Sequence, residues 1–146
     1  MRSLAFWDTS ALVPLCVPQA TSAHVSSLSN IFDAAVWWAT PFEIAGALAR
    51  LERMEAIGRT DHAKATKLAE GMAQWWHVIE PSDELLVEAT QIVRRYDLRS
   101  ADALQLAAAM EWCDHQPFHQ AFFSLDKRLR EAAKLSGFDA HQFFSS

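Results

Sequence analysis

The chain alternates short β-prone runs with longer stretches of helical spacing, and this alternation limits its possible folds more than any other feature. The β-prone runs are rich in aromatic or β-branched residues and fall at residues 4–7, 35–39, 77–80, 121–124 and, more weakly, 140–144. Helices between successive strands favour parallel pairing of those strands. The sequence therefore predicts an α/β fold built on a parallel sheet of about five strands.

Length and composition fit one domain. The chain has 146 residues, of which 51% are hydrophobic, and no Pro-, Gly- or Ser-rich run divides it, so we expect a single domain over residues 1–146. Neither a signal peptide nor an apolar stretch of membrane-helix length is evident, which predicts a cytoplasmic protein. Cys16 and Cys113 form no CxxC pair, and we expect both to be buried thiols.

The net charge of −5 argues against a protein that grips nucleic acid by broad, non-specific electrostatics. It does not exclude an RNA substrate. Divalent ions bound at a cluster of acids would offset most of that charge where the substrate sits.

Several helices carry recognisable start or stop signals. Thr40 is expected to cap a helix, with Pro41 at the first helical position and Glu43 at the capping-box position. Apolar residues at helical spacing follow. Further signals are capping residues Ser82 and Ser100 and, after a last helix at 126–135, the stop at Gly137.

Four acids occupy equivalent places on this frame. Asp8 and Asp126 follow the first and fourth strands, while Glu43 and Asp102 lie in the first turns of helices. Parallel α/β sheets build their sites at the carboxyl ends of strands and the amino ends of helices. Each acid alone also has a structural explanation as a helix cap or as a partner of the helix dipole. The joint pattern is what favours a site.

Carboxylates that converge repel one another, so the folded protein must either protonate some of them or bind a cation. All-oxygen ligands without histidine or thiolate suit a hard ion such as Mg²⁺ or Mn²⁺ and do not suit Zn²⁺. The acids therefore predict a Mg²⁺ or Mn²⁺ site.

Motifs around these acids resemble a known family. The segments are DTSAL at 8–12, Glu43 followed by Ala47 and Leu48, LRSADALQLA at 98–107, and FSLDKRL at 123–129. In this order, they resemble the PIN-domain ribonucleases, especially the VapC-type toxins of bacterial toxin–antitoxin pairs. The resemblance spans nearly the whole chain.

The resemblance implies a PIN-like, doubly wound parallel sheet with helices on both faces, metal-dependent hydrolysis of RNA phosphodiester bonds, a homodimer and inhibition by a cognate antitoxin. Carried over, Asp8 and Asp102 would be the principal metal ligands. Glu43 would hold a second ion or a metal-bound water, and Asp126 would complete the cluster. Three hydroxyl side chains would orient these acids: Thr9, Ser10 and Ser124. The implied mechanism is in-line attack by a metal-activated water.

Other candidate residues carry weaker signals. Arg99 and Lys127, nearest the acids, are the basic residues expected to contact RNA. Trp37 and Trp38 are expected in the core because both faces of the sheet are covered. The pair Trp75 and Trp76 lies near an element boundary, where core, a dimer or antitoxin contact and base stacking all remain open. All six histidines are expected at surface or ordinary polar positions.

Three alternatives compete with the nuclease. A phosphohydrolase with an aspartate nucleophile would carry a second aspartate where Ser10 stands, and a receiver domain would need an acidic pair near the first strand. The third is a non-catalytic PIN-fold binding module that acts through a protein partner. An antitoxin peptide covering the acidic cleft, with an arginine that pairs with the carboxylates, is the partner we expect for the nuclease.

Overall fold

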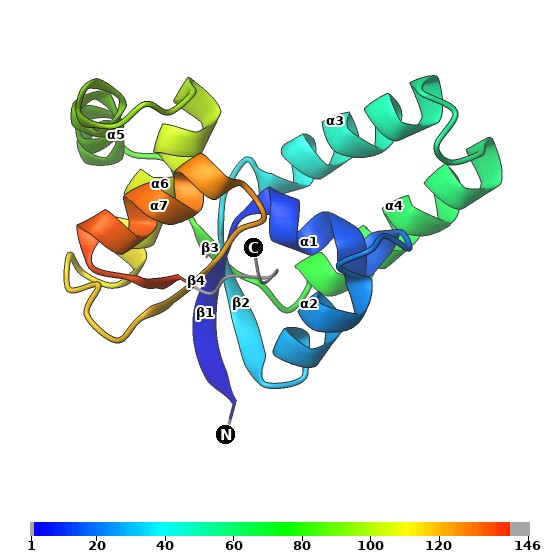
Figure 1. Cartoon of the computed structure of the whole chain (residues 1–146), viewed down its shortest axis with the longest axis horizontal. Helices are drawn as coiled ribbons and strands as arrows, with labels where there is room; N and C mark the ends of the chain where they lie inside the picture. The colour runs from blue at the N-terminus through cyan, green and yellow to red at the C-terminus, as the bar shows by residue number, and fades with distance from the viewer. Residues whose placement is uncertain (1, 141–146) are drawn as a thin grey trace.

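A computed structural model describes residues 2–140, and its strands form one parallel sheet (Figure 1). The strands are β1 (Ser3–Trp7), β2 (Phe32–Trp37), β3 (His77–Ile79), β4 (Ala121–Phe123) and β5 (Asp139–Ala140). The helices are α1 (Thr9–Cys16), α2 (Ser22–Ser29), α3 (Thr40–Arg53), α4 (Arg59–Ala73), α5 (Asp83–Arg95), α6 (Ser100–Trp112) and α7 (Lys127–Ser136). The predicted α/β class is confirmed.

The strand order is β3-β2-β1-β4-β5, with every pairing parallel. The chain winds outward from β1 through β2 to β3 and then returns to the other side of β1 for β4. This reversal makes the gap between the carboxyl ends of β1 and β4 the topological switch point, where doubly wound sheets bind their ligands.

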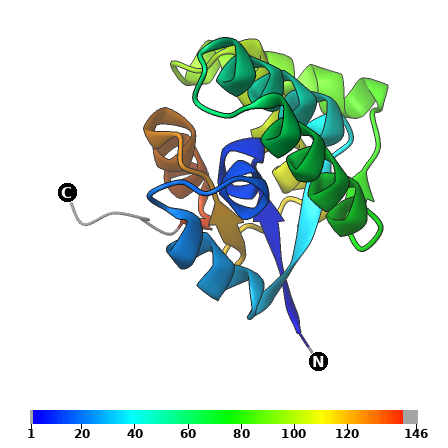
Figure 2. The ribbon, with the colours of Figure 1, turned by 90° about the vertical axis from the view of Figure 1, so that its right-hand side faces the viewer.

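Helices cover both faces of the sheet, as Figure 1 and the turned view in Figure 2 show. Strand residues alternate between the two resulting layers. Phe6 and Phe122 pack with α5, α6 and α7, whereas Trp7 and Phe123 pack with α1 to α4. The rings of Phe6 and Phe122 stack, with centroids 5.6 Å apart. Aromatic packing therefore fixes the alignment of β1 and β4, the two strands that lead into the switch point.

The predicted strands are present with shifted ends. β2 begins three residues earlier than expected. It ends at Trp37, two residues earlier than expected, because the chain turns into α3 at Thr40. β3 and β4 each end one residue earlier than predicted. The last predicted strand, at 140–144, overlaps β5 only at Ala140, and residues 141–144 lie outside the described part of the chain.

Two capping predictions were wrong by one residue. Ala39 is the N-cap of α3, and Thr40 is already helical, with a buried hydroxyl that has no hydrogen-bond partner among residues 2–140. Arg99, not Ser100, precedes α6 as its N-cap. Ser82 caps α5 as predicted, accepting a hydrogen bond from the Leu85 amide at 3.1 Å.

The end of α7 follows the prediction. Gly137 follows that helix with φ 114°, a left-handed conformation that favours glycine. The helix itself begins at Lys127, one residue later than expected, because Asp126 is its N-cap.

The tryptophan pairs divide differently from the expectation. Trp37 is buried, but Trp38 is 54% exposed because β2 has ended and the chain has turned away from the sheet. The predicted burial of Trp38 was wrong. At the end of α4, Trp75 is 83% exposed and Trp76 is partly buried. Within residues 2–140, no helix is both long enough and apolar enough to cross a membrane.

Candidate active site

Asp8 lies at the carboxyl end of the central strand β1, beside the switch point. Its residue is only 4% exposed, and Oδ2 accepts hydrogen bonds from the Ser10 hydroxyl at 2.5 Å and the Ser124 hydroxyl at 2.8 Å. The pKa of Asp8 is raised to about 6: burial is the main cause, the hydrogen bonds from Ser10 and Ser124 oppose the rise, and the charge of Glu43 contributes to it. The carboxylate is thus held in place at an electrostatic cost.

The same two serines tie the loop after β4 to the start of α1. Ser10 accepts from the Leu125 amide at 2.8 Å, and Ser124 accepts from the Asp126 amide at 3.1 Å. The loop that carries Asp126 is therefore fixed next to Asp8.

Asp126 itself has a structural role. Its Oδ1 accepts the Leu129 amide at 3.0 Å and caps α7. That bond engages one carboxylate oxygen and satisfies one of the free amides at the start of the helix.

Glu43 projects from the first turn of α3 toward α1 and α6. Its Oε1 accepts the Thr9 hydroxyl at 2.6 Å and the Gln105 amide nitrogen at 2.7 Å. The expected capping box was wrong, because the side chain bonds these two residues instead of the start of its own helix. Glu43 occupies the capping-box position, but its side chain connects three helices, α1, α3 and α6.

Asp102 lies in the first turn of α6 and is partly buried. Its pKa is raised to about 6, mainly by burial and also by the charges of Asp8 and Asp126, while Arg99 opposes the rise. The acids are therefore close enough to act on one another: Glu43 on Asp8, and both Asp8 and Asp126 on Asp102. The fold thus brings together the four acids singled out in the sequence.

The surrounding hydroxyl residues also lie where the motifs put them. Thr9 contacts Glu43, while Ser10 and Ser124 contact Asp8. Their assigned role in orienting metal ligands remains a prediction.

Gln105 also contacts the site and was not predicted from the sequence; it is 1% exposed and lies one helical turn after Asp102. A polar residue three positions after an acid, within an otherwise apolar helix, is the signal that could have indicated it.

The donor set is compatible with a hard divalent ion. Among residues 2–140, no three His, Cys, Asp or Glu side chains already stand in a metal-binding arrangement. Mg²⁺ does not require one, since it commonly uses one or two carboxylates and fills its remaining positions with water and substrate phosphate. Asp8 and Asp102, both with raised pKa values, are carboxylates that a cation would relieve.

Basic side chains border the acids. Arg99 precedes α6 and is close enough to Asp102 to lower its pKa. Arg130 donates to the Ser124 carbonyl at 3.1 Å, which adds a fixed positive charge to the β4–α7 loop. Lys127 is exposed at the start of α7. Contacts of Arg99 and Lys127 with RNA remain predictions.

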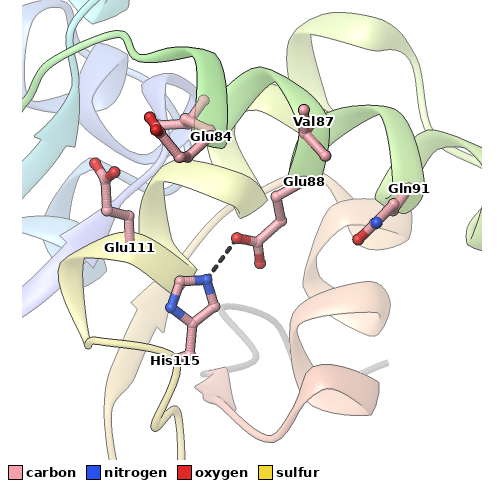
Figure 3. Close-up of a pocket in the computed structure, with 7 residues that line it drawn as sticks. Glu84, Val87, Glu88, Gln91, Glu111 and His115 are labelled. Atoms are coloured by element: carbon pink, nitrogen blue, oxygen red, sulfur yellow. Dashed lines mark hydrogen bonds and ion pairs between the residues drawn. The ribbon is translucent and has the colours of Figure 1, made fainter.

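A second acidic region lies away from these residues, on α5 and the end of α6 (Figure 3). Glu84, Glu88 and Glu111 line a groove of about 340 Å³, and Glu88 bonds the ring of His115 at 2.6 Å. His115 is exposed, in line with the surface position predicted for it. Glu84 and Glu111 are exposed and Glu88 is partly buried, whereas Asp8 is buried at the switch point.

Solved structures share this fold. A toxin–antitoxin complex from Klebsiella pneumoniae aligns with TM-score 0.64 and 13% identity, covering 97% of this chain and 99% of that one. PAE2754 from Pyrobaculum aerophilum aligns with TM-score 0.63 and 22% identity over 96% and 90% of the two chains. FitAcB from Neisseria gonorrhoeae aligns with TM-score 0.67 and 16% identity over 93% and 97%.

Sequence comparisons add no relative: no family model matches the chain, and neither does any curated protein. The likeness therefore lies in the three-dimensional arrangement, five parallel strands with helices on both faces. The chain has the PIN-like α/β fold that its motifs indicate.

Proposed function

We propose that the chain is a Mg²⁺- or Mn²⁺-dependent endoribonuclease and the toxin of a type II toxin–antitoxin pair. The observation that carries this proposal is the convergence of Asp8, Glu43, Asp102 and Asp126 at the switch point of a PIN-like fold. A structural cap explains Asp126 but explains neither the burial of Asp8 nor the mutual repulsion of these groups.

In this proposal, Asp8 and Asp102 hold the ion, with Glu43 and Asp126 completing the set. A bound divalent ion would offset the negative charge on the phosphoryl oxygens and would make water a better nucleophile near neutral pH. Ser10 and Ser124 keep the Asp8 carboxylate in one orientation through their hydrogen bonds. No protein nucleophile is required.

The positive charges at the rim of the site would bind the RNA substrate. Arg99 and Lys127 begin neighbouring helices next to two of the acids, where each could pair with a phosphate of RNA. This local arrangement allows RNA binding despite the net charge of −5.

We further propose an antitoxin as the partner of this chain, in the cytoplasm, and a homodimer as its own assembly. One of the structural neighbours supports the partner, because it is described as a toxin–antitoxin complex. On this chain, Trp75 is 83% exposed beside an apolar groove of about 370 Å³ that Leu15, Met72 and Trp76 help to line. Such a groove suits apolar side chains of a partner.

The nuclease is tested by incubating a mixed tRNA and rRNA pool with the protein in Mg²⁺, Mn²⁺ or EDTA. Asp8→Asn and Asp102→Asn variants, shown to be folded, run beside the wild type. We expect cuts that need the metal and disappear in both variants. Cleavage that persists in EDTA or in both variants would refute the assigned site.

The partner is tested separately, by a pull-down from the native host. Recovery of a small protein encoded beside this chain supports the antitoxin, and recovery of none counts against it.

A non-catalytic binding module that acts only through a protein partner is the alternative function. It predicts no RNA cleavage and no stabilisation by Mn²⁺, so a thermal melt with and without the ion separates it from the nuclease.

A further inference from the structure

Gln105 connects three helices inside the protein. It lies on α6, is 1% exposed, and donates from Nε2 to Glu43 Oε1 on α3 at 2.7 Å and to Thr9 Oγ1 on α1 at 3.2 Å. The Thr9 hydroxyl donates in turn to the same Glu43 oxygen. Two donors from different helices thus converge on one carboxylate oxygen.

Chemistry fixes the direction of these bonds. An ionised carboxylate can only accept hydrogen bonds, so the nitrogen of the Gln105 amide must face Glu43. The Thr9 hydroxyl gives its hydrogen to Glu43 and accepts from Gln105 with a lone pair. Within residues 2–140, the hydrogen bonds found to the Glu43 side chain all end on Oε1. Oε2 is left for other ligands.

A contribution to stability does not explain why a glutamine occupies position 105. The Oε1 atom of Gln105 is buried and has no hydrogen-bond partner in the described structure, an arrangement that ordinarily destabilises a protein. An apolar side chain of similar volume would fill the same space without that penalty. Because Gln105 stands one turn after Asp102, its amide reaches Glu43 from the helix that also supplies the third acid.

We propose that Gln105 is a positioning residue for the metal site: with Thr9 it fixes the Glu43 carboxylate, so that the oxygen without hydrogen bonds serves the ion. This inference rests on the proposed function, because it requires that Asp8, Asp102 and Glu43 bind a divalent cation. Residues that orient metal ligands typically contribute on the order of 10- to 100-fold in metal affinity.

The test is a calorimetric titration of Mn²⁺ into the full chain, for the wild type, Gln105→Met, Glu43→Gln and the double variant. Methionine keeps the side-chain length and removes the amide. We expect Gln105→Met to weaken Mn²⁺ binding roughly 10- to 100-fold while the melting temperature of the metal-free protein stays the same or rises. In the Glu43→Gln background the same change should have little further effect, because a residue that acts through another is not additive with it.

Controls separate this role from ordinary packing. Leu106→Met alters a fully buried neighbour on α6 and should leave Mn²⁺ affinity unchanged. Thr9→Val removes the other donor to Glu43 and should weaken binding in the same direction as Gln105→Met, so it carries the test if Gln105→Met does not fold.

Two outcomes overturn the inference while leaving the proposed function intact. One is wild-type affinity in Gln105→Met, and the other is an effect of equal size with and without Glu43. If the wild type itself binds no Mn²⁺, the proposed function fails and this inference fails with it.

Discussion

Replacing Asp8 with asparagine should stabilise the metal-free protein, although it removes a proposed metal ligand. The carboxylate is buried at 4% exposure and is disfavoured in its charged form by desolvation and by the charge of Glu43. Asparagine is isosteric and uncharged. Its carbonyl oxygen can accept the hydrogen bonds that Ser10 and Ser124 now donate to Oδ2.

The pKa of Asp8 sets the magnitude and sign of the effect. Its pKa in the folded protein is about 6, against an ordinary value of 3.8. Between these values the folded state retains a proton that the unfolded chain has lost, so the free energy of unfolding falls as pH rises. At 1.36 kcal/mol per pKa unit, the penalty above pH 6 amounts to at most about 3 kcal/mol. Asp8→Asn should recover about 1–3 kcal/mol there, since it also gives up charge-assisted hydrogen bonds.

The assay is thermal and urea denaturation in EDTA at several pH values between 4 and 8, with wild type and Asp8→Asn compared. The stability difference should be small near pH 4, grow up to about pH 6 and then level off. Glu70→Gln, which removes an exposed acid on α4, is the matched control and should show no such rise. An Asp8→Asn protein no more stable than wild type at pH 7.5 would refute the conclusion that the buried charge of Asp8 destabilises the metal-free protein.

Three further substitutions test other parts of the structure, each measured by denaturation in EDTA at pH 7.5. Ser124→Ala removes a donor to Asp8 and should lower the free energy of unfolding by about 1–3 kcal/mol, whereas no change would mean that this bond is not formed. Gly137→Ala should destabilise by about 1–3 kcal/mol, because φ is 114° and the new Cβ would lie 3.0 Å from Pro117 Cγ; a neutral result would contradict that conformation. Asp126→Asn preserves the cap of α7 and should be nearly neutral, while Asp126→Ala should lose about 0.5–2 kcal/mol; equal losses would show that the capping bond is unimportant.

Much of the fold could be predicted because periodicity reports which side of an element is buried. The start of β2, in contrast, could not be predicted from the sequence. Asp33 interrupts its apolar run and is exposed, yet the strand begins at Phe32, which is in register with Ser3 of β1. Backbone pairing with a neighbouring strand decided this boundary, and a single sequence does not display that pairing. Trp38 was misplaced for the related reason that the end of β2 depends on where α3 begins.

The acids of the candidate site could be predicted because their positions follow from strand ends and helix starts. The contacts that these acids make with other side chains could not be predicted. Glu43 satisfies the spacing of a capping box, and only the approach of α1 and α6 reveals that Thr9 and Gln105 bind it. Gln105 reads in the sequence as an isolated polar residue, since its role depends on three helices that meet only in the folded protein.

The position of a bound divalent ion tests the proposed site most directly. Mn²⁺ broadens the NMR signals of amides near it, so the backbone spectrum of the metal-free protein, recorded while Mn²⁺ is added in substoichiometric steps, locates the ion. We predict that the amides of Thr9, Ser10, Asp102 and Asp126 are lost first, while those of the α5 groove around Glu84 and Glu88 persist. Broadening centred on that groove, or spread without preference over the acidic surface, would contradict a metal site at the carboxyl end of β1.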